Sequence, residues 1–419
     1  MKKSWSCSGL HYSIFAAPDV LRHCCKRFFV NGQMRGDVEI FKVFSNSDIS
    51  TKKILEHKQK LYEDINSGKE TPCSSCPWIK YDDWEPFNKL KIKHLSIENH
   101  TVCNLRCTYC NETYYGGKKS NYDIMHLYKE LKLKDAFDEN ISLVWGGGEP
   151  LLLNSFYEIF STLTQELAPS RNNIFTNAII YSDSVAKYLK EGKVTITTSI
   201  DAGFRSTYNK IRGSDKLITV LQNLKKYYQC DKDGITVKYL LLQENSNEDE
   251  VLAFVDKIKE YGLSGCTFQI STNYKTERID EKIARTSIFL FNELKKCGTK
   301  LINFDDHLRP RLNSMRDSLN IKSSYSDKDV IIWGAGDYAE MMLKESSFFN
   351  NRNIRCFVDS SRQKHGKKFG PYEIKPPKAV LENEDTYIFI ASTSYYRQIY
   401  SQILDMGVSP KRIIDDVVI

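Results

Sequence analysis

The sequence predicts an α/β fold with three parts: a small cysteine-rich N-terminal domain, a larger core and a C-terminal half-domain. Three observations predict this fold. Short β-like runs alternate with amphipathic segments between about residues 90 and 304, five cysteines lie within the first 76 residues, and residues 329–343 read as strand, glycine turn and helix. We place the domains at residues 1–84, 85–310 and 328–419, with a polar linker at 322–327. A length of 419 residues allows two or three domains.

The composition excludes several classes of protein. With 41% hydrophobic and 27% charged residues the chain is typical of a globular protein, and its net charge of +7 is not clustered as in a nucleic-acid-binding surface. No run approaches about eighteen apolar residues, so we expect no membrane span. The first residues show no signal-peptide pattern, and twelve cysteines without such a signal favour a reducing compartment, with the cytoplasm as the default.

In the core, six candidate strands are separated by helical segments with apolar residues at i, i+3, i+4 and i+7. The residues with this spacing are Leu217, Val220, Leu221 and Leu224 in one segment and Val251, Phe254, Val255 and Ile258 in another. Such alternation predicts parallel strands, and six units predict a partial (β/α)6 barrel of the TIM type, whose site lies at the carboxyl ends of the strands. The candidate strands are Lys91–Glu98, Ile141–Trp145, Asn172–Ile180, Val194–Ile200, Thr236–Gln243 and Cys266–Ser271.

The cysteines Cys103, Cys107 and Cys110 lie in the run CNLRCTYC, with C-x3-C-x2-C spacing, directly after the first candidate strand. Three thiolates this close can hold three corners of one iron–sulfur cubane. No fourth cysteine lies on this loop, so the fourth iron is left open to bind another molecule. A zinc knuckle is the alternative, although zinc sites usually show two pairs of Cys or His ligands.

The second candidate strand is followed by a glycine run, VWGGGEP, at residues 144–150. Glycines such as Gly147 and Gly148 let the backbone approach a ligand closely where a Cβ would clash. The carboxylate of Glu149 offers a negative partner to an ammonium group. The alternative is an ordinary turn between a strand and a helix.

Together, the cysteine loop and the Gly-Gly-Glu run about forty residues later resemble the radical S-adenosylmethionine (radical SAM) enzymes. The resemblance implies that Cys103, Cys107 and Cys110 hold a [4Fe–4S] cluster whose open iron binds the amino and carboxylate groups of SAM. It further implies that an electron from the cluster breaks the bond between sulfur and C5′, giving methionine and a 5′-deoxyadenosyl radical.

The same resemblance implies contacts to SAM at further strand ends. Tyr109 matches the aromatic position near the adenine, and Gly147, Gly148 and Glu149 match the run that holds the amino group. In the segment TSIDAG…YNKIRG, Ser199 and Asp201 match residues near the ribose, and Arg212 matches one that reaches the carboxylate. Asn177, at the end of the third strand, is a weaker candidate. The alternative is that a polar residue such as Asp201 caps a helix.

The N-terminal cysteines resemble the auxiliary-cluster domain called SPASM, or its shortened twitch form. The resemblance covers roughly residues 1–80 and rests on a C-x2-C-P ending and a CC pair; in most relatives this domain follows the barrel, whereas here it precedes it. It implies that Cys7, Cys24, Cys73 and Cys76 ligate a second [4Fe–4S] cluster, with Cys25 as the spare. A structural zinc bound by the same four thiolates is the alternative.

In the C-terminal part, Gly334, Gly336 and Ala339 fit the pattern G-x-G-x-x-A between a strand and a helix, and Asp359 ends the next strand. This is the Rossmann dinucleotide fingerprint, in which a helix N-terminus favours a phosphate. About ninety residues provide only one half of a dinucleotide fold. The unit resembles small WGAG-type domains attached to sugar-modifying acyltransferases and methyltransferases, which implies binding of a nucleotide sugar or a role in assembly.

These observations predict an anaerobic radical SAM enzyme that abstracts hydrogen from a sugar or nucleotide sugar. A peptide or protein substrate is the alternative that the SPASM resemblance favours. The electron donor would be a flavodoxin or ferredoxin, and no nucleic-acid partner is expected. A non-enzymatic binding protein stabilised by zinc is the remaining alternative.

Overall fold

Six strands lie in chain order at the positions that the hydrophobic pattern predicts. The computed structural model describes residues 3–320, 325, 327–349, 352–392 and 395–417. The six strands are β8 (Ile92–Ile97), β9 (Phe137–Trp145), β10 (Arg171–Phe175), β11 (Thr195–Ser199), β12 (Ile235–Leu241) and β13 (Thr267–Thr272). The neighbouring pairs β8/β9, β9/β10 and β10/β11 are parallel, as is the pair of β13 with β14 (Ile302–Phe304). The α/β fold class is therefore confirmed, and the strand order in the described residues shows no closed ring.

The chain divides into two compact units. Unit 1 comprises residues 1–237 and 274–277, and unit 2 comprises residues 238–273 and 278–419. Strand β12 begins in unit 1 and ends in unit 2. The predicted domain limits at residues 84 and 328 fall inside these units, so the three-domain division stays a prediction. Of the predicted linker at 322–327, only Tyr325 and Asp327 lie within the described residues.

In unit 1, the N-terminal segment extends the parallel sheet. The strand order is β11-β10-β9-β8-β2-β3-β6, in which β2 (Ser13–Ala16) pairs parallel with β8. Strands β3 (Val20–Arg22) and β6 (Glu39–Lys42) continue the sheet by antiparallel pairing. The sequence pattern did not predict these strands, because each has only three or four residues and polar neighbours. The cysteine-rich segment is consequently built onto the edge of the core.

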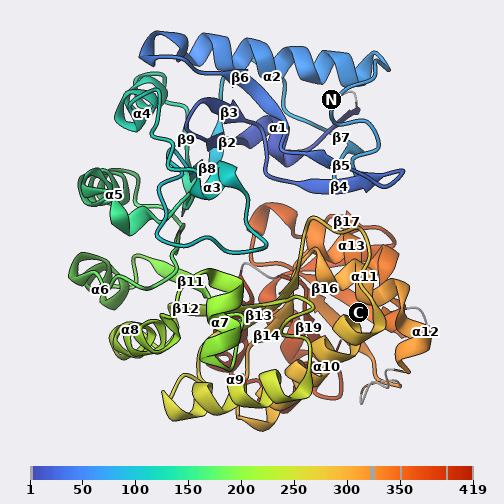
Figure 1. Ribbon diagram of the computed structural model, residues 1–419. Coiled ribbons are helices and arrows are strands. Elements are labelled where there is room, and N and C mark those ends of the chain that lie inside the picture. Colours follow the sequence, from blue (N-terminus) through green and yellow to red (C-terminus); the bar gives the residue numbers. More distant parts are fainter. Residues whose placement is uncertain (1–2, 321–324, 326, 350–351, 393–394, 418–419) are drawn as a thin grey trace. The chain divides into compact units, whose positions relative to one another are not determined.

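The helices of unit 1 begin and end where capping residues place them. Helix α6 (Asp183–Lys190) begins after Ser182, whose hydroxyl accepts the Val185 N–H at 3.2 Å. Helix α7 (Arg205–Arg212) ends at Gly213, which has φ +71°, a conformation that glycine adopts without a Cβ penalty. Figure 1 shows α4 (Ile124–Leu133), α5 (Asn154–Leu167), α6 and α8 (Leu217–Cys230) in a row along the strands of this unit. The predicted apolar stripe of α8 is buried.

The remaining elements of unit 1 are short, apart from one N-terminal helix. These elements are β1 (Ser4–Ser6), α1 (Ser8–Tyr12), β4 (Arg27–Val30), β5 (Gln33–Gly36), η1 (Asn46–Asp48), α2 (Thr51–Asn66), β7 (Lys80–Asp82), α3 (Glu112–Tyr115) and η2 (Pro150–Leu152). Strand β1 pairs with β7, and β4 pairs with β5 in a hairpin.

Unit 2 contains the end of the core and the C-terminal half-domain. Its first strands have the order β14-β13-β12, and α9 (Glu248–Glu260) buries its predicted apolar stripe. The half-domain is a five-stranded sheet of order β17-β18-β16-β15-β19, parallel except for β17. One buried cluster includes Ile332 and Phe357 and another includes Ile331 and Val358, so neighbouring residues of one strand pack on opposite faces of this sheet.

The other elements of unit 2 are the five strands of the half-domain sheet and a set of mostly short helices. They are α10 (Glu281–Lys296), α11 (Leu308–Ser314), α12 (Arg316–Leu319), β15 (Val330–Trp333), α13 (Asp337–Glu345), η3 (Ser347–Phe349), β16 (Ile354–Val358), η4 (Arg362–Lys364), β17 (Lys368–Phe369), β18 (Tyr372–Lys375), η5 (Pro377–Leu381), β19 (Tyr387–Ile390), α14 (Tyr396–Asp405) and η6 (Pro410–Arg412). None of the described helices combines the length and apolar character that a bilayer crossing requires.

An aromatic cluster between α5, α6 and β9 stabilises unit 1. Phe160 is 1% exposed, and its ring centroid lies 5.3 Å from those of Trp145 and Phe156. We predict that Phe160→Ala lowers the free energy of unfolding by about 3–5 kcal/mol, because the lost apolar contacts leave a cavity. Urea unfolding followed by tryptophan fluorescence measures the effect. Phe44→Ala is the control, since Phe44 is 75% exposed; equal midpoints for the two variants would contradict the prediction.

Candidate functional site

The three-cysteine loop follows β8, and main-chain hydrogen bonds tie it to the turn after β9. The Gly148 N–H donates to the His100 carbonyl at 2.9 Å, and the Glu149 N–H donates to the Val102 carbonyl at 2.8 Å. Because β8 and β9 are parallel neighbours, the loops after them leave the sheet at the same edge. The structure thus brings together the two motifs that the sequence places about forty residues apart.

The glycines of this turn are required by the approach of the cysteine loop. A Cβ on Gly148 would lie 2.1 Å from the Val102 carbonyl oxygen, which is a backbone atom that cannot rotate away. Gly147 has φ +91°, and its Cβ would lie 2.5 Å from the His100 carbonyl oxygen. Gly146 differs, because the nearest atom to its Cβ would be a side-chain carbon of Glu98 at 3.9 Å. Protein contacts therefore explain two of the three glycines before any ligand is considered.

The side chain of Glu149 is buried and held in place by three donors. Its Oε1 accepts the Leu151 N–H at 3.2 Å and the Thr176 hydroxyl at 2.7 Å, and its Oε2 accepts the Asn177 N–H at 2.7 Å. Burial raises the pKa of Glu149 above its ordinary value, and these hydrogen bonds oppose that shift. A carboxylate offers about four acceptor positions, so Oε2 keeps one for a further donor such as an ammonium group.

Asn177 joins the end of β10 to the cysteine loop. Besides its backbone bond to Glu149, its Nδ2 donates to Asn104 Oδ1 at 2.7 Å. Asn104 directly follows Cys103, so the third strand helps to position the loop. In this structure Asn177 contacts both motifs, and any contact to SAM stays a prediction.

Arg212 closes the other side of the cysteine loop. Its Nη1 donates to Cys107 Sγ at 3.2 Å and to the Tyr109 hydroxyl, and its Nη2 donates to the Ser199 carbonyl. Asp201 Oδ2 accepts the Tyr109 hydroxyl at 2.8 Å and lies 3.4 Å from Arg212 Nε. Arg212 is 5% exposed and Asp201 is fully buried, so the four predicted positions form one internal network.

The structure does not support the alternative that Asp201 caps the following helix. Helix α7 begins after Phe204, so Asp201 does not cap it. Asp201 has φ +59°, which turns its carboxylate toward Tyr109 and Arg212 at the end of β11. The main chain adds to the same junction, since the Arg106 N–H donates to the Arg212 carbonyl at 3.2 Å and the Thr108 N–H donates to the Ile211 carbonyl at 2.9 Å.

The donor set of the loop fits a cluster held at three corners. Burial raises the pKa of Cys103, and together with the charges of Glu149, Cys107 and Cys110 it brings this pKa to about 11, so the three thiols lie within electrostatic reach of one another. The Arg212 guanidinium donates to the sulfur of Cys107 at 3.2 Å, so a basic side chain lies against one of the three thiols. In the described part of the chain, no group of three or more His, Cys, Asp or Glu side chains has the geometry for one metal ion.

The N-terminal cysteines also come together. Cys7 is the N-cap of α1, and its Sγ accepts the Leu10 N–H at 3.4 Å. A Cβ on Gly9 would lie 3.3 Å from Cys24 Cβ and 3.8 Å from Cys7 Sγ, so glycine leaves room between these two cysteines. The pKa of Cys73 is raised to about 12. Burial is the largest cause, and the charges of Cys7, Cys76 and Cys24 act in the same direction. Four thiols in mutual electrostatic reach supply the number of ligands that a cubane or a zinc site needs, although among the described residues they do not converge on a single ion.

The second pair of this set lies on a turn that supplies main-chain donors. The Cys76 N–H donates to the Cys73 carbonyl at 3.0 Å. Burial raises the pKa of Cys76 to about 11, and the backbone N–H groups of Trp78 and Ile79 at its sulfur oppose that shift. The sequence treats Cys25 as the spare cysteine, and its strongest charged neighbours are Glu98 and Lys26 rather than the other thiols.

The C-terminal glycine turn needs glycine at Gly334 but not, for steric reasons within the chain, at Gly336. Gly334 has φ +115°, and a Cβ there would lie 2.7 Å from the Ala391 carbonyl oxygen, whereas a Cβ on Gly336 would meet no atom within 4 Å. Asp359 is already engaged within the chain. Its Oδ2 accepts the Ala335 N–H at 3.0 Å and Lys364 Nζ at 2.8 Å. The carboxylate thus braces the turn, and a contact to a ribose stays a prediction.

Two lysines near the cysteines were not found by sequence reasoning. Lys275 Nζ donates to the Cys110 carbonyl at 2.5 Å, and Lys58 lies buried near Cys7 and Cys24. Lys275 carries no recognisable signal, because it lies 165 residues from Cys110 in the sequence. Lys58 does carry a sequence signal. Thr51, Ile54 and Lys58 follow helical spacing, which indicates that Lys58 lies on the buried face of the helix, and all three are buried.

Comparison with known proteins finds two family models that match parts of this chain. Residues 100–281 match the model of the Radical SAM superfamily, and residues 326–414 match a family described as C2185-like, N-terminal. Among curated proteins, GTP 3′,8-cyclase of Yersinia pestis is 30% identical over 40% of this chain and 52% of its own length. GTP 3′,8-cyclase of Haemophilus influenzae (strain KW20) is 24% identical over 52% of this chain and 64% of its own length. The chain therefore spans between half and two thirds of these relatives.

Solved structures give a weaker likeness. Streptococcus suis SuiB bound to precursor peptide SuiA has a TM-score of 0.43 at 14% identity, covering 62% of this chain and 65% of that chain. The protein anSMEcpe with bound AdoMet and a Cp18Cys peptide has a TM-score of 0.40 at 19% identity, covering 55% and 67%. These values are too low to carry an argument about substrate.

The glycine geometry gives a paired test of the site. We predict that Gly148→Ala lowers SAM affinity at least tenfold and weakens the hold of the cysteine loop, because the new Cβ collides with the Val102 backbone. Gly146→Ala is expected to bind SAM within about twofold of the parent protein, since its Cβ has ordinary contacts. Isothermal titration with SAM under anaerobic conditions measures both. Equal affinities for the two variants would show that the close approach does not matter.

Proposed function

We propose that this protein is a radical SAM enzyme that reductively cleaves SAM and abstracts hydrogen from a nucleotide-linked sugar, because residues 100–281 match the model of the Radical SAM superfamily. A [4Fe–4S] cluster and SAM are the cofactors of the superfamily. The observation that carries the proposal is the junction of three thiols with the Gly147–Glu149 turn and Arg212. The chain matches its curated relatives over less than two thirds of their length, so its activity is inferred from its own residues.

The residues of the site divide the work of binding and positioning. Cys103, Cys107 and Cys110 would hold the cluster, and the remaining acceptor position on Glu149 would receive the SAM ammonium group. A cluster held there would supply the electron for cleavage of SAM into methionine and a 5′-deoxyadenosyl radical, and that radical would take the hydrogen atom from substrate. Tyr109 and Arg212 are fixed by Asp201, so the loop keeps its shape while SAM enters.

The substrate class rests on the C-terminal half-domain. Its glycine turn leaves open space at Gly336, beside the N-terminus of α13, and such a turn favours a phosphate group. Among the relatives, the name GTP 3′,8-cyclase likewise refers to a nucleotide. A nucleotide sugar is consistent with both. A peptide substrate is the second candidate, which the resemblance of the N-terminal cysteine segment to the SPASM domain favours.

We further propose that the four N-terminal cysteines hold a second metal centre, a [4Fe–4S] cluster rather than zinc. An electron donor of the flavodoxin or ferredoxin type would supply the reducing equivalents. In this role the second centre would pass electrons to or from the substrate. We expect the protein to act in the cytoplasm, where thiols are kept reduced.

The reaction is tested by the product that only SAM cleavage gives. The chain is reconstituted with iron and sulfide under anaerobic conditions, and SAM and dithionite are added. We predict 5′-deoxyadenosine by mass spectrometry from the parent protein and none above background from Cys110→Ala, which lacks one cluster ligand. Cys230→Ala is the matched control, because Cys230 lies on α8 outside both cysteine sets and should leave the yield unchanged. A colourless zinc protein that forms no product would sink the proposal.

The substrate class needs its own assay. Nucleotide sugars, GTP and short peptides are each added to the reaction, and the rate of 5′-deoxyadenosine formation is compared with the rate without substrate. The proposal predicts stimulation by a nucleotide sugar. Stimulation by peptides alone would favour the second candidate.

A further inference from the structure

Lys58 is a fully buried lysine, and no carboxylate among the described residues pairs with it. It lies on α2, is 0% exposed, and its Nζ donates to the Leu10 carbonyl at 2.7 Å and to the Ser13 carbonyl at 2.8 Å. In the described part of the chain no carboxylate forms a salt bridge with Lys58. Lysines are almost never fully buried unless an anion pairs with them. An ammonium group has three donors, so two carbonyls leave one N–H without an acceptor.

Two cysteines of the N-terminal set, Cys7 and Cys24, lie within electrostatic reach of Lys58. The charges of Cys7 and Cys24 raise its pKa, against the larger effect of burial, which lowers it to about 7. Leu10, whose carbonyl accepts from Lys58, also donates its N–H to Cys7 Sγ. The main chain of Leu10 therefore links the two groups, because its N–H contacts the Cys7 sulfur and its carbonyl contacts the Lys58 ammonium group.

The nearby histidines cannot provide the same charge. His11 and His23 are buried, and burial together with the charge of Lys58 lowers their pKa values, His11 to about 4. Lys58 is therefore the basic side chain that an anionic centre at these thiols would hold in its charged form, at a position where solvent does not screen it.

The thiols need such a cation once they bind a metal. Four cysteine thiolates around a [4Fe–4S]²⁺ core or a zinc ion leave a net charge of −2. A charge buried beside that centre interacts strongly, because the surrounding dielectric is low. The lysine and the centre each offset the charge that would otherwise be costly to bury.

We propose that Lys58 is the buried counter-charge of the four-cysteine centre and that it strengthens metal binding there and favours reduction of a bound cluster. Lys58 is thus a positioning residue, since it acts through the thiolates and touches no reacting atom. The inference rests on the second metal centre of the proposed function. It adds a residue outside the cysteine pattern that controls that centre.

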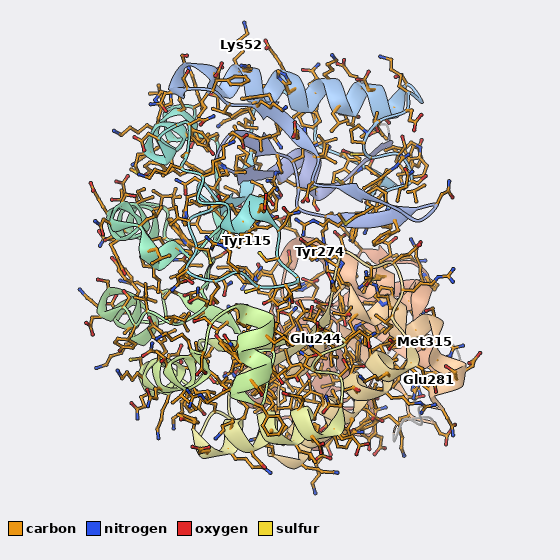
Figure 2. All side chains as sticks on the ribbon, viewed as in Figure 1. Lys52, Tyr115, Glu244, Tyr274, Glu281 and Met315 are labelled. Carbon is orange, nitrogen blue, oxygen red and sulfur yellow. The ribbon has the colours of Figure 1, made fainter. Side chains whose placement is uncertain are left out.

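The experiment isolates the second centre in the full-length chain. Cys103, Cys107 and Cys110 are replaced by alanine, so that iron, sulfide and zinc analyses report on the N-terminal set alone. Lys58→Gln keeps hydrogen-bond donors without the charge, and Lys58→Met removes both. Lys52→Gln is the control. Lys52 lies on the same helix as Lys58, but its side chain points outward into solvent, as Figure 2 shows.

The neutral variants should alter the centre in the same direction. For a cluster, we expect Lys58→Gln and Lys58→Met to disfavour one-electron reduction about tenfold, a shift of 59 mV to more negative potential in an EPR-monitored titration. We expect both to lose metal to a chelator at least tenfold faster than the Lys52→Gln control. If the metal is zinc, chelator loss alone reports the effect. Lys58→Arg, which keeps the charge, should stay near the parent value.

The outcomes separate this inference from the proposed function. A four-cysteine set that takes up no metal in the parent protein would overturn the second centre and the role of Lys58 with it. A loaded set whose potential and metal retention are unchanged in Lys58→Gln would overturn the role of Lys58 alone. Far-ultraviolet circular dichroism confirms that each variant is folded. Where Lys58→Gln is unfolded, a Lys58→Arg protein with an altered potential contradicts the inference.

Discussion

The structure of the candidate site depends on how tightly the three-cysteine loop is held between two neighbouring segments. On one side, the backbone of the Gly147–Glu149 turn donates to the carbonyls of His100 and Val102. On the other side, the end of α7 accepts from the loop backbone, and the Arg212 guanidinium donates to Cys107 Sγ. A loop of this length would otherwise sample many conformations, and ordering it costs entropy. These contacts hold the backbone of the loop that carries the three thiols before a cluster forms.

The same constraint explains why a carboxylate and a guanidinium are buried side by side. Asp201 and Arg212 offset each other's charge, and the Tyr109 hydroxyl completes the network. Removing one partner would leave a buried charge without its counterpart, which is costly. The role proposed for Lys58 follows the same principle, because Lys58 lies within electrostatic reach of Cys7 and Cys24. Both cysteine sets combine thiols with a buried basic side chain and with backbone N–H donors.

Much of the fold could be predicted from the sequence because the core follows simple periodicity. The six predicted strands are all found, although the third ends at Phe175 rather than at Ile180, since Thr176 and Asn177 turn to contact Glu149. The strands β2, β3 and β6 were missed, because three or four residues give no clear alternation. Spacing identified the ligand-type residues. It could not show that Asp359 braces its own turn or that Arg212 reaches Cys107, because these contacts depend on tertiary structure.

The central claim is that one iron of the cluster at Cys103, Cys107 and Cys110 is open to SAM. The most direct measurement is the EPR spectrum of the reduced, reconstituted protein before and after addition of SAM. If SAM binds that iron, the signal of this cluster changes in g-values or shape, while the signal of a second, fully ligated cluster stays the same. A spectrum that is identical with and without saturating SAM would contradict the account.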